Sequence, residues 1–264
     1  MKRILAQITL LALSVLLSAC LEMTSVITAN KDGSAIVEET VLVSAQMKAM
    51  MAAAAAGGGG EQGGPNMKDL LPDQAKAEER AKKLGDGVTV KSREEVKTPD
   101  GKEGVKVTYS VPKIANLKYE PFNSDNKGGE SKPITFKLDG SKLSVSLPPD
   151  ANKEDKAAEK PKMPKEQMQA QLAMMKPMFA GMRVNFQIKG ANGIANSDAS
   201  NFKADAVTIM DIQFDKLMEN QDVFMKVMES MDDKSMTPKK VSEQFKNVDG
   251  LKIEGKEAIS IDLK

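Results

Sequence analysis

The sequence predicts an α+β fold in which antiparallel β-hairpins form a sheet and helices pack on one face of that sheet. Two observations support this class. Short runs of β-branched and alternating apolar residues flank turns that contain Asp-Gly, a pattern typical of hairpins. Other stretches carry apolar residues three and four positions apart, which is the spacing of an amphipathic helix. Hairpins with helices interspersed favour an antiparallel sheet that is covered by helices.

Three hairpins are expected. In each, the glycine after Asp supplies the positive φ that a tight turn needs. Their strand pairs are 23–29 with 35–43, 88–97 with 105–111, and 134–138 with 142–147. Further strands are expected at 183–189, 206–214, 248–254 and 258–263, whereas 113–132 and 190–202 read as irregular or turn-rich.

Helices are predicted at 44–56, 72–84, 164–182, 217–231 and 237–247. Ser44 is a plausible N-cap for the first helix, Gly85 ends the second, and Pro164 and Pro238 suit first-turn positions. The sequence contains 18 methionines, and most of them fall in these helical stretches.

The helix at 164–182 has the clearest apolar stripe. It consists of Met168, Leu172, Met175, Phe179 and Met182. Methionine is flexible and polarizable, and it recurs both in irregular cores and at permissive binding surfaces. The stripe is therefore a candidate surface for a ligand or partner, and packing on the sheet as core is the competing interpretation.

The domain organisation follows from composition. Residues 20–147 form an N-terminal α+β region with a glycine-rich loop at 57–66, and 148–162 is a charged linker. Residues 163–264 form a C-terminal α+β region. The sequence leaves open whether the two regions are one domain or two.

The first 19 residues have the three parts of a secretion signal: Lys2 and Arg3, an apolar run, and small residues before Cys20. The segment Leu17-Ser18-Ala19-Cys20 resembles the lipobox of bacterial lipoproteins. It predicts cleavage before Cys20 and attachment of a diacylglyceryl group, with acyl chains such as palmitate, to that thiol as a thioether. The thiol is the only one in the chain. Two or three acyl chains make such an anchor effectively permanent. The first expected strand starts within about three residues of Cys20, so the tether to the membrane is expected to span only about 10 Å.

Composition limits the chemistry. The mature chain has 36 Lys and Arg against 37 Asp and Glu, and aromatic residues make up 4%, so a nucleic-acid-binding surface is not expected. Histidine is absent, which removes the commonest general base and metal ligand. No metal, no cofactor and no enzymatic activity are predicted. Adjacent carboxylates such as Glu38-Glu39 point to opposite faces of a strand, and all such pairs are interpreted as solvated charge.

Three segments of the chain resemble the LppM-like family of bacterial envelope lipoproteins. They are Asn30-Lys31-Asp32-Gly33-Ser34, Glu38-Glu39-Thr40 and the later stretch from Val184 to Phe214. The resemblance covers about half of the chain and consists of strands and turns. It implies an α/β envelope domain without known catalysis, for which binding of membrane lipid has been proposed in a mycobacterial member. This chain departs from that family in its Met-rich helices and in lacking a C-terminal transmembrane segment.

These observations favour a membrane-anchored envelope lipoprotein that binds lipid or another apolar ligand near the bilayer. The alternative is a structural or assembly lipoprotein that docks another envelope protein through its Met-rich helices. Leu21 follows the cysteine, where Asp retains lipoproteins at the inner membrane in many Gram-negative bacteria. The outer membrane is therefore favoured if the host is Gram-negative.

Overall fold

The computed structural model describes residues 21–56, 71–121, 133–147, 179–232 and 237–264. They form two β-sheets with short helices, so the predicted α+β class is confirmed. The large sheet has eight strands and the second sheet has five.

The large sheet is built around the first strand of the described chain. Its strands lie in the order β10-β11-β8-β1-β2-β4-β3, and β12 pairs with β11. They are β1 (Leu21–Ala29), β2 (Ala35–Val43), β3 (Thr89–Lys97), β4 (Glu103–Val111), β8 (Arg183–Gly190), β10 (Phe202–Lys203), β11 (Ala206–Gln213) and β12 (Leu251–Ile253). The first two predicted hairpins are present as β1–β2 and β3–β4, with turns through Gly33 and Gly101 at positive φ.

The prediction of a purely antiparallel sheet is wrong at one position, because β8 pairs with β1 in parallel. Hairpin connections force neighbouring strands to run antiparallel, but β8 follows β1 by more than 150 residues, so no short turn constrains its direction. The pairing places Glu22 beside Arg183 and Ile27 beside Ile188.

The second sheet contains the third predicted hairpin. Its order is β5-β6-β7-β13-β9, with β5 (Lys118–Tyr119), β6 (Ile134–Asp139), β7 (Lys142–Ser146), β9 (Ile194–Ser197) and β13 (Ala258–Leu263). The short strands β5, β9 and β10 were not predicted, because two to four residues are too few to show a period-two pattern.

The described helices are α2 (Ala45–Ala56), α4 (Gln74–Leu84), the 3-10 turn η1 (Ile114–Asn116), α6 (Phe214–Met218), α7 (Gln221–Asp232) and α8 (Pro238–Gln244). The expected helix at 217–231 is interrupted near Asn220, whose side-chain oxygen accepts a hydrogen bond from the Val223 N–H and so caps α7. Asp73 and Thr237 cap α4 and α8 in the same way.

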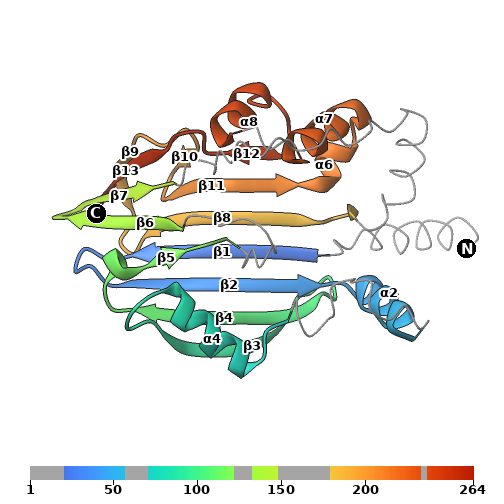
Figure 1. Cartoon of the computed structure of the whole chain (residues 1–264), viewed down its shortest axis with the longest axis horizontal. Coiled ribbons are helices and arrows are strands. Elements are labelled where there is room, and N and C mark those ends of the chain that lie inside the picture. Colours follow the sequence, from blue (N-terminus) through green and yellow to red (C-terminus); the bar gives the residue numbers. More distant parts are fainter. Residues whose placement is uncertain (1–20, 57–70, 122–132, 148–178, 233–236) are drawn as a thin grey trace, which may run out of the picture.

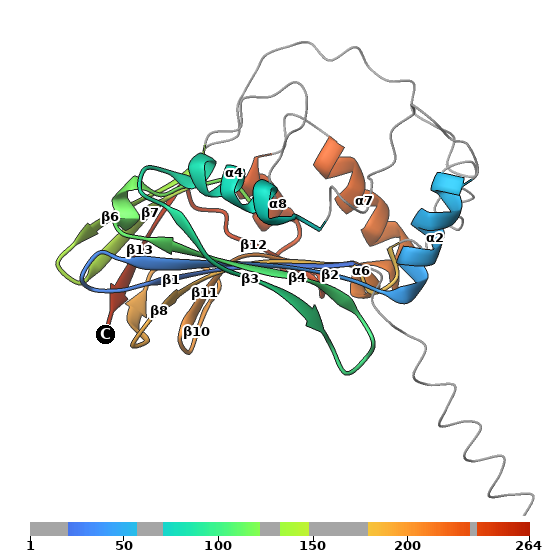
Figure 2. The ribbon, with the colours of Figure 1, turned by 90° about the horizontal axis from the view of Figure 1, so that it is seen from below.

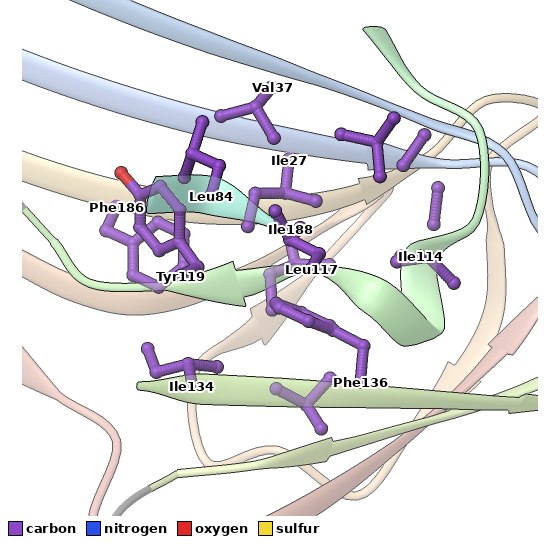
Figure 3. Close-up of a cluster of buried hydrophobic side chains, with 14 of the residues drawn as sticks. Ile27, Val37, Leu84, Ile114, Leu117, Tyr119, Ile134, Phe136, Phe186 and Ile188 are labelled. Carbon is purple, nitrogen blue, oxygen red and sulfur yellow. The ribbon is translucent and has the colours of Figure 1, made fainter. Parts of the chain in front are cut away.

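The main core lies between the two sheets. Ile27, Val37, Phe186 and Ile188 of the large sheet meet residues such as Phe136 of the second sheet, with Leu117 between them (Figure 3). Leu84 and its neighbours on α4 close the same core. The inner face of the large sheet is thus covered mainly by another sheet together with α4, and the expected arrangement of helices packed on one face is not shown.

A second apolar cluster lies around α6, α7 and α8. Its buried members are Val184, Ile212, Phe214, Leu217, Phe224, Val227, Val241, Phe245 and Leu251. Figure 1 shows these helices beside β11 and β12, away from the second sheet. The regions 20–147 and 163–264 both contribute strands to both sheets: β1 pairs with β8, and β7 pairs with β13.

Candidate functional site

An anchor on Cys20 would attach to the fold at the start of the first strand, β1. Cys20 itself lies outside the described residues. The next residue, Leu21, already belongs to β1, is only 6% exposed, and is paired with Val43 at the end of β2. The strand on the other side, β8, begins beside Glu22. We call this end of the large sheet, where β1 and β8 begin and β2 and β11 end, the tether end.

Helices flank the tether end on both sides. Helix α2 starts at Ala45, two residues beyond Val43, and α6 starts directly after β11. Figure 1 shows α2 on one side of the start of β1, and α6 with α7 on the other. Figure 2 shows the same helices at that end in the perpendicular view.

Two of the five predicted stripe residues can be placed. Met168, Leu172 and Met175 lie outside the described residues. Phe179 stacks on Phe214, with 5.3 Å between the ring centroids, and meets Phe224 edge-on at 5.9 Å. Met182 precedes β8, and its backbone carbonyl accepts a hydrogen bond from the Phe214 N–H. Both Phe179 and Met182 are partly buried against the second apolar cluster.

Methionines surround this cluster at the tether end. Met23, Met182, Met218 and Met228 are all partly buried against it, so part of each side chain stays accessible. Unbranched thioether side chains repack at low energetic cost. The apolar surface of this cluster can therefore adapt in shape.

The charged side chains near the start of β1 are paired with one another. Glu103 on β4 accepts hydrogen bonds from Lys48 on α2 and from Lys97 on β3. These two hydrogen bonds lower the pKa of Glu103 to about 2. The Lys48 contact also joins α2 to the large sheet.

Lys102 is the second centre of charge at this end and is 8% exposed. Its ammonium lies 3.1 Å from Glu22 and 3.3 Å from Asp100. Burial by itself would lower the pKa of Lys102, but the two carboxylates outweigh that effect and raise it. On the other side of β1, Arg183 binds both oxygens of Asp211, at 2.8 and 3.1 Å.

A buried polar cluster lies under α4. Arg80 is 9% exposed; its Nη2 is 2.9 Å from Glu39 Oε1 and 2.6 Å from the Glu120 carbonyl. Its guanidinium carbon also lies 5.6 Å from the centroid of the Tyr119 ring. Glu38 and Glu39 do point to opposite faces, and Glu38 pairs with Lys106. The interpretation of Glu39 as solvated charge is wrong, because α4 covers it with Arg80, a contact that sequence spacing could not reveal.

The two tyrosines of the chain border this cluster. Burial, and then the charge of Glu39, raise the pKa of Tyr109 and of Tyr119. Among the described residues, the Tyr119 hydroxyl and the neighbouring Ser25 hydroxyl have no hydrogen-bond partner. The cluster opens onto neither of the hollows described next, and its geometry is that of a structural ion pair.

Two surface hollows on the described residues are lined mostly by polar residues. One, of about 590 Å³, lies on the outer face of the large sheet between Thr28, Glu38, Lys91 and Lys106. The other, of about 830 Å³, lies between α8 and β11–β12 and includes Asp211 and Lys252. Neither is an apolar groove that would enclose an acyl chain.

Within the described ranges, no group of three or more acidic side chains is placed to hold a metal ion. No helix in this part of the chain is long and apolar enough to cross a membrane.

Comparisons with known proteins add little. No protein-family model matches the chain, and no curated protein matches it. Among solved structures, the chain is similar to the NMR structure of the folded domain of Mycobacterium tuberculosis LppM, with a TM-score of 0.34 and 13% identity. The alignment covers 74% of this chain and 83% of that chain. The resemblance to the LppM-like family is thus supported only as weak structural similarity, and no argument about function rests on it.

Proposed function

We propose that the chain is a lipid-anchored protein of the bacterial cell envelope whose folded domain is held directly against the bilayer. The observation that carries the proposal is the start of β1 at Leu21, one residue after the lipobox cysteine. One extended residue spans roughly 3.3 Å, so the tether is shorter than the 10 Å expected from the sequence. An acylated Cys20 would leave no stalk between the lipid and a central strand of the sheet.

The proposed role is binding of lipid or another apolar ligand, and not catalysis. The second apolar cluster is the candidate surface, because it lies at the tether end and carries the partly buried Met182 and Met218. Phe179, another residue of the predicted stripe, packs on it. Docking of another envelope protein on this surface is the alternative.

The anchor is tested by intact mass and peptide mass spectrometry of the full chain expressed in a bacterial host. We expect a mature N-terminal peptide that begins at Cys20 and carries the mass of a diacylglyceryl group, with or without a third acyl chain. The Cys20→Ala variant should lack that mass. A wild-type peptide with a free Cys20 thiol, or cleavage at another bond, would contradict the proposal.

Ligand binding is tested with a diazirine-labelled fatty acid that is photo-crosslinked to the mature protein in detergent. Cross-links should map to peptides of the second cluster and decrease in Met182→Gln. Leu138→Gln is the matched control, because Leu138 is also partly buried but lies in the β6–β7 hairpin and packs on the main core. Uniform labelling of both regions would argue against a lipid site, and protein cross-links in cells would support the docking alternative.

A further inference from the structure

The direction of β1 relates the anchor to the whole domain. The strand runs from Leu21 to Ala29, which is roughly 30 Å at 3.3 Å per residue, and lies along the long axis of the molecule (Figure 1). The turn at Lys31 therefore lies at the opposite end from the tether. A lipid attached to the residue before Leu21 places the bilayer within a few ångströms of the tether end alone.

The tether end is also where apolar side chains are left partly uncovered. Phe179, Met182 and Met218 are partly buried on the α6 side. On the α2 side, Met47 and Met51 are half-buried and Ala49 is exposed. The only polar residues of α2 are Gln46 and Lys48, both in its first turn, so the rest of the helix has no polar side typical of a helix facing water.

The charges at this end do not oppose contact with a bilayer. Ion pairs at this end of the sheet include Lys48 with Glu103, Lys102 with Glu22, and Arg183 with Asp211. The opposite charges of each pair sum to zero, and each partner keeps a counter-charge when water is reduced. Contact at this end therefore depends on apolar side chains and the anchor more than on attraction to anionic lipid.

We propose that the domain stands end-on on the membrane, with the tether end in the head-group region and the turn at Lys31 pointing away. Helix α2 and the Phe179–Met182–Met218 surface contact the lipid on the two sides of the anchor. The outer face of the large sheet and the second sheet then both stand clear of the bilayer. This orientation rests on the proposed anchor at Cys20, and it leaves the hollow beside Lys91 accessible to soluble partners.

The sequence offers a clean test, because its single cysteine is consumed by the anchor and any introduced cysteine is then the only free thiol. The mature lipidated chain would carry an NBD fluorophore at one position in each variant and would be reconstituted into phosphatidylcholine vesicles. Quenching would be compared with and without a doxyl-labelled lipid. The tether-end probes are Ala49→Cys and Glu219→Cys, and the controls are Lys31→Cys at the far end, Lys91→Cys on the outer face and Lys137→Cys on the second sheet. All five positions are exposed, so labelling should leave the fold intact, which circular dichroism checks.

We expect quenching at Ala49 and Glu219 to exceed that at each control at least about threefold, because only side chains in the head-group region approach the doxyl label. Strong quenching at Lys91 or Lys137 would mean that the domain lies on one of its sheets, and equal quenching at all positions would mean free tumbling. Either result overturns the end-on orientation while leaving the anchor intact. If the emission of the probe at position 49 were blue-shifted but not quenched by doxyl lipid, α2 would be covered by protein. That result would also overturn the end-on orientation. Failure of the wild-type chain to float with vesicles would refute the anchor itself, and the orientation with it.

Discussion

Arg80 on α4 donates a hydrogen bond to Glu39 on β2 at 2.9 Å, across 41 residues of sequence, and both side chains are largely shielded from water. The second acceptor of the guanidinium, the Glu120 carbonyl, joins the helix to the end of β5, the edge strand of the second sheet. One side chain thus connects three parts of the fold.

Replacing Arg80 should strongly destabilise the protein. Arg80→Ala leaves Glu39 buried without a counter-charge, and breaking such a pair costs about 3 kcal/mol. The double variant Arg80→Met with Glu39→Leu should recover most of that loss, because neither charge remains. Urea unfolding followed by circular dichroism measures both changes.

The matched control for Arg80 is Lys83→Ala on the same helix, whose partner Glu79 is 65% exposed. An exposed pair of this kind contributes well under about 1 kcal/mol. If Arg80→Ala cost no more than Lys83→Ala, the buried ion pair would have no structural importance.

The tyrosines give a direct spectroscopic test of burial. The chain has two tyrosines and no tryptophan, so absorbance near 295 nm reports tyrosinate alone. Burial raises the pKa of Tyr109 and Tyr119, so neither should ionise near pH 10 while the protein is folded. The unfolded chain ionises first, so the free energy of unfolding should fall as the pH rises above about 10.

The measurement is a pH titration of absorbance in buffer and in 8 M urea, with circular dichroism followed in parallel. In urea both tyrosines should titrate near the ordinary value of about 10. In buffer, the absorbance rise should coincide with loss of secondary structure. Titration of either tyrosine in the folded protein near pH 10 would show that its hydroxyl is accessible.

The decrease in the free energy of unfolding at low pH should depend on Asp211. Burial would raise the pKa of this carboxyl, but hydrogen bonds from Arg183 and Gln213 outweigh burial and lower it. Because the folded-state pKa lies below that of the unfolded chain, the stabilisation is complete above about pH 5 and is lost as the pH falls below about 4. Asp211→Asn should be less stable than wild type at pH 7 and should lose less stability between pH 5 and pH 3.

The control for Asp211 is Asp86→Asn, at an exposed position between β3 and α4. Its stability should follow wild type at each pH in urea unfolding. If Asp211→Asn lost as much stability between pH 5 and pH 3 as the wild type, the bidentate contact with Arg183 would contribute nothing to the acid dependence.

Gly104 should not tolerate a side chain. It lies on β4 opposite Leu42, where an added Cβ would sit 1.8 Å from the backbone carbonyl oxygen of Val41. Relieving that overlap requires a shift of β2 or β4, so Gly104→Ala should cost more than about 3 kcal/mol, at or beyond the upper end of overpacking. In the control Gly140→Ala the Cβ meets nothing within 4 Å, and the cost should be about 1 to 2 kcal/mol from its positive φ. If Gly104→Ala and Gly140→Ala lost equal stability in thermal unfolding, the sheet would be able to shift at Gly104 at little cost.

The predicted elements that match best are those encoded by neighbouring residues. The β2 strand was predicted at 35–43 and is found at Ala35–Val43, because alternation on both sides of an Asp-Gly turn specifies a hairpin locally. The helix expected at 217–231 is divided into α6 and α7, because the side chain of Asn220 caps the start of α7. Of the candidate stripe, Phe179 and Met182 lie within the described residues, and the role of the stripe as a binding surface stays a prediction.

The sequence alone determined the α+β class and the three hairpins, and it predicts the anchor at Cys20, since each depends on residues within a few positions of one another. Only the tertiary structure decided that β8 joins β1 in parallel, that Arg80 covers Glu39, and that β1 lies in the middle of the large sheet. These relationships join residues from about 40 to more than 150 positions apart. Burial of apolar faces selects such pairings for the chain as a whole, and no local pattern records which partner is chosen.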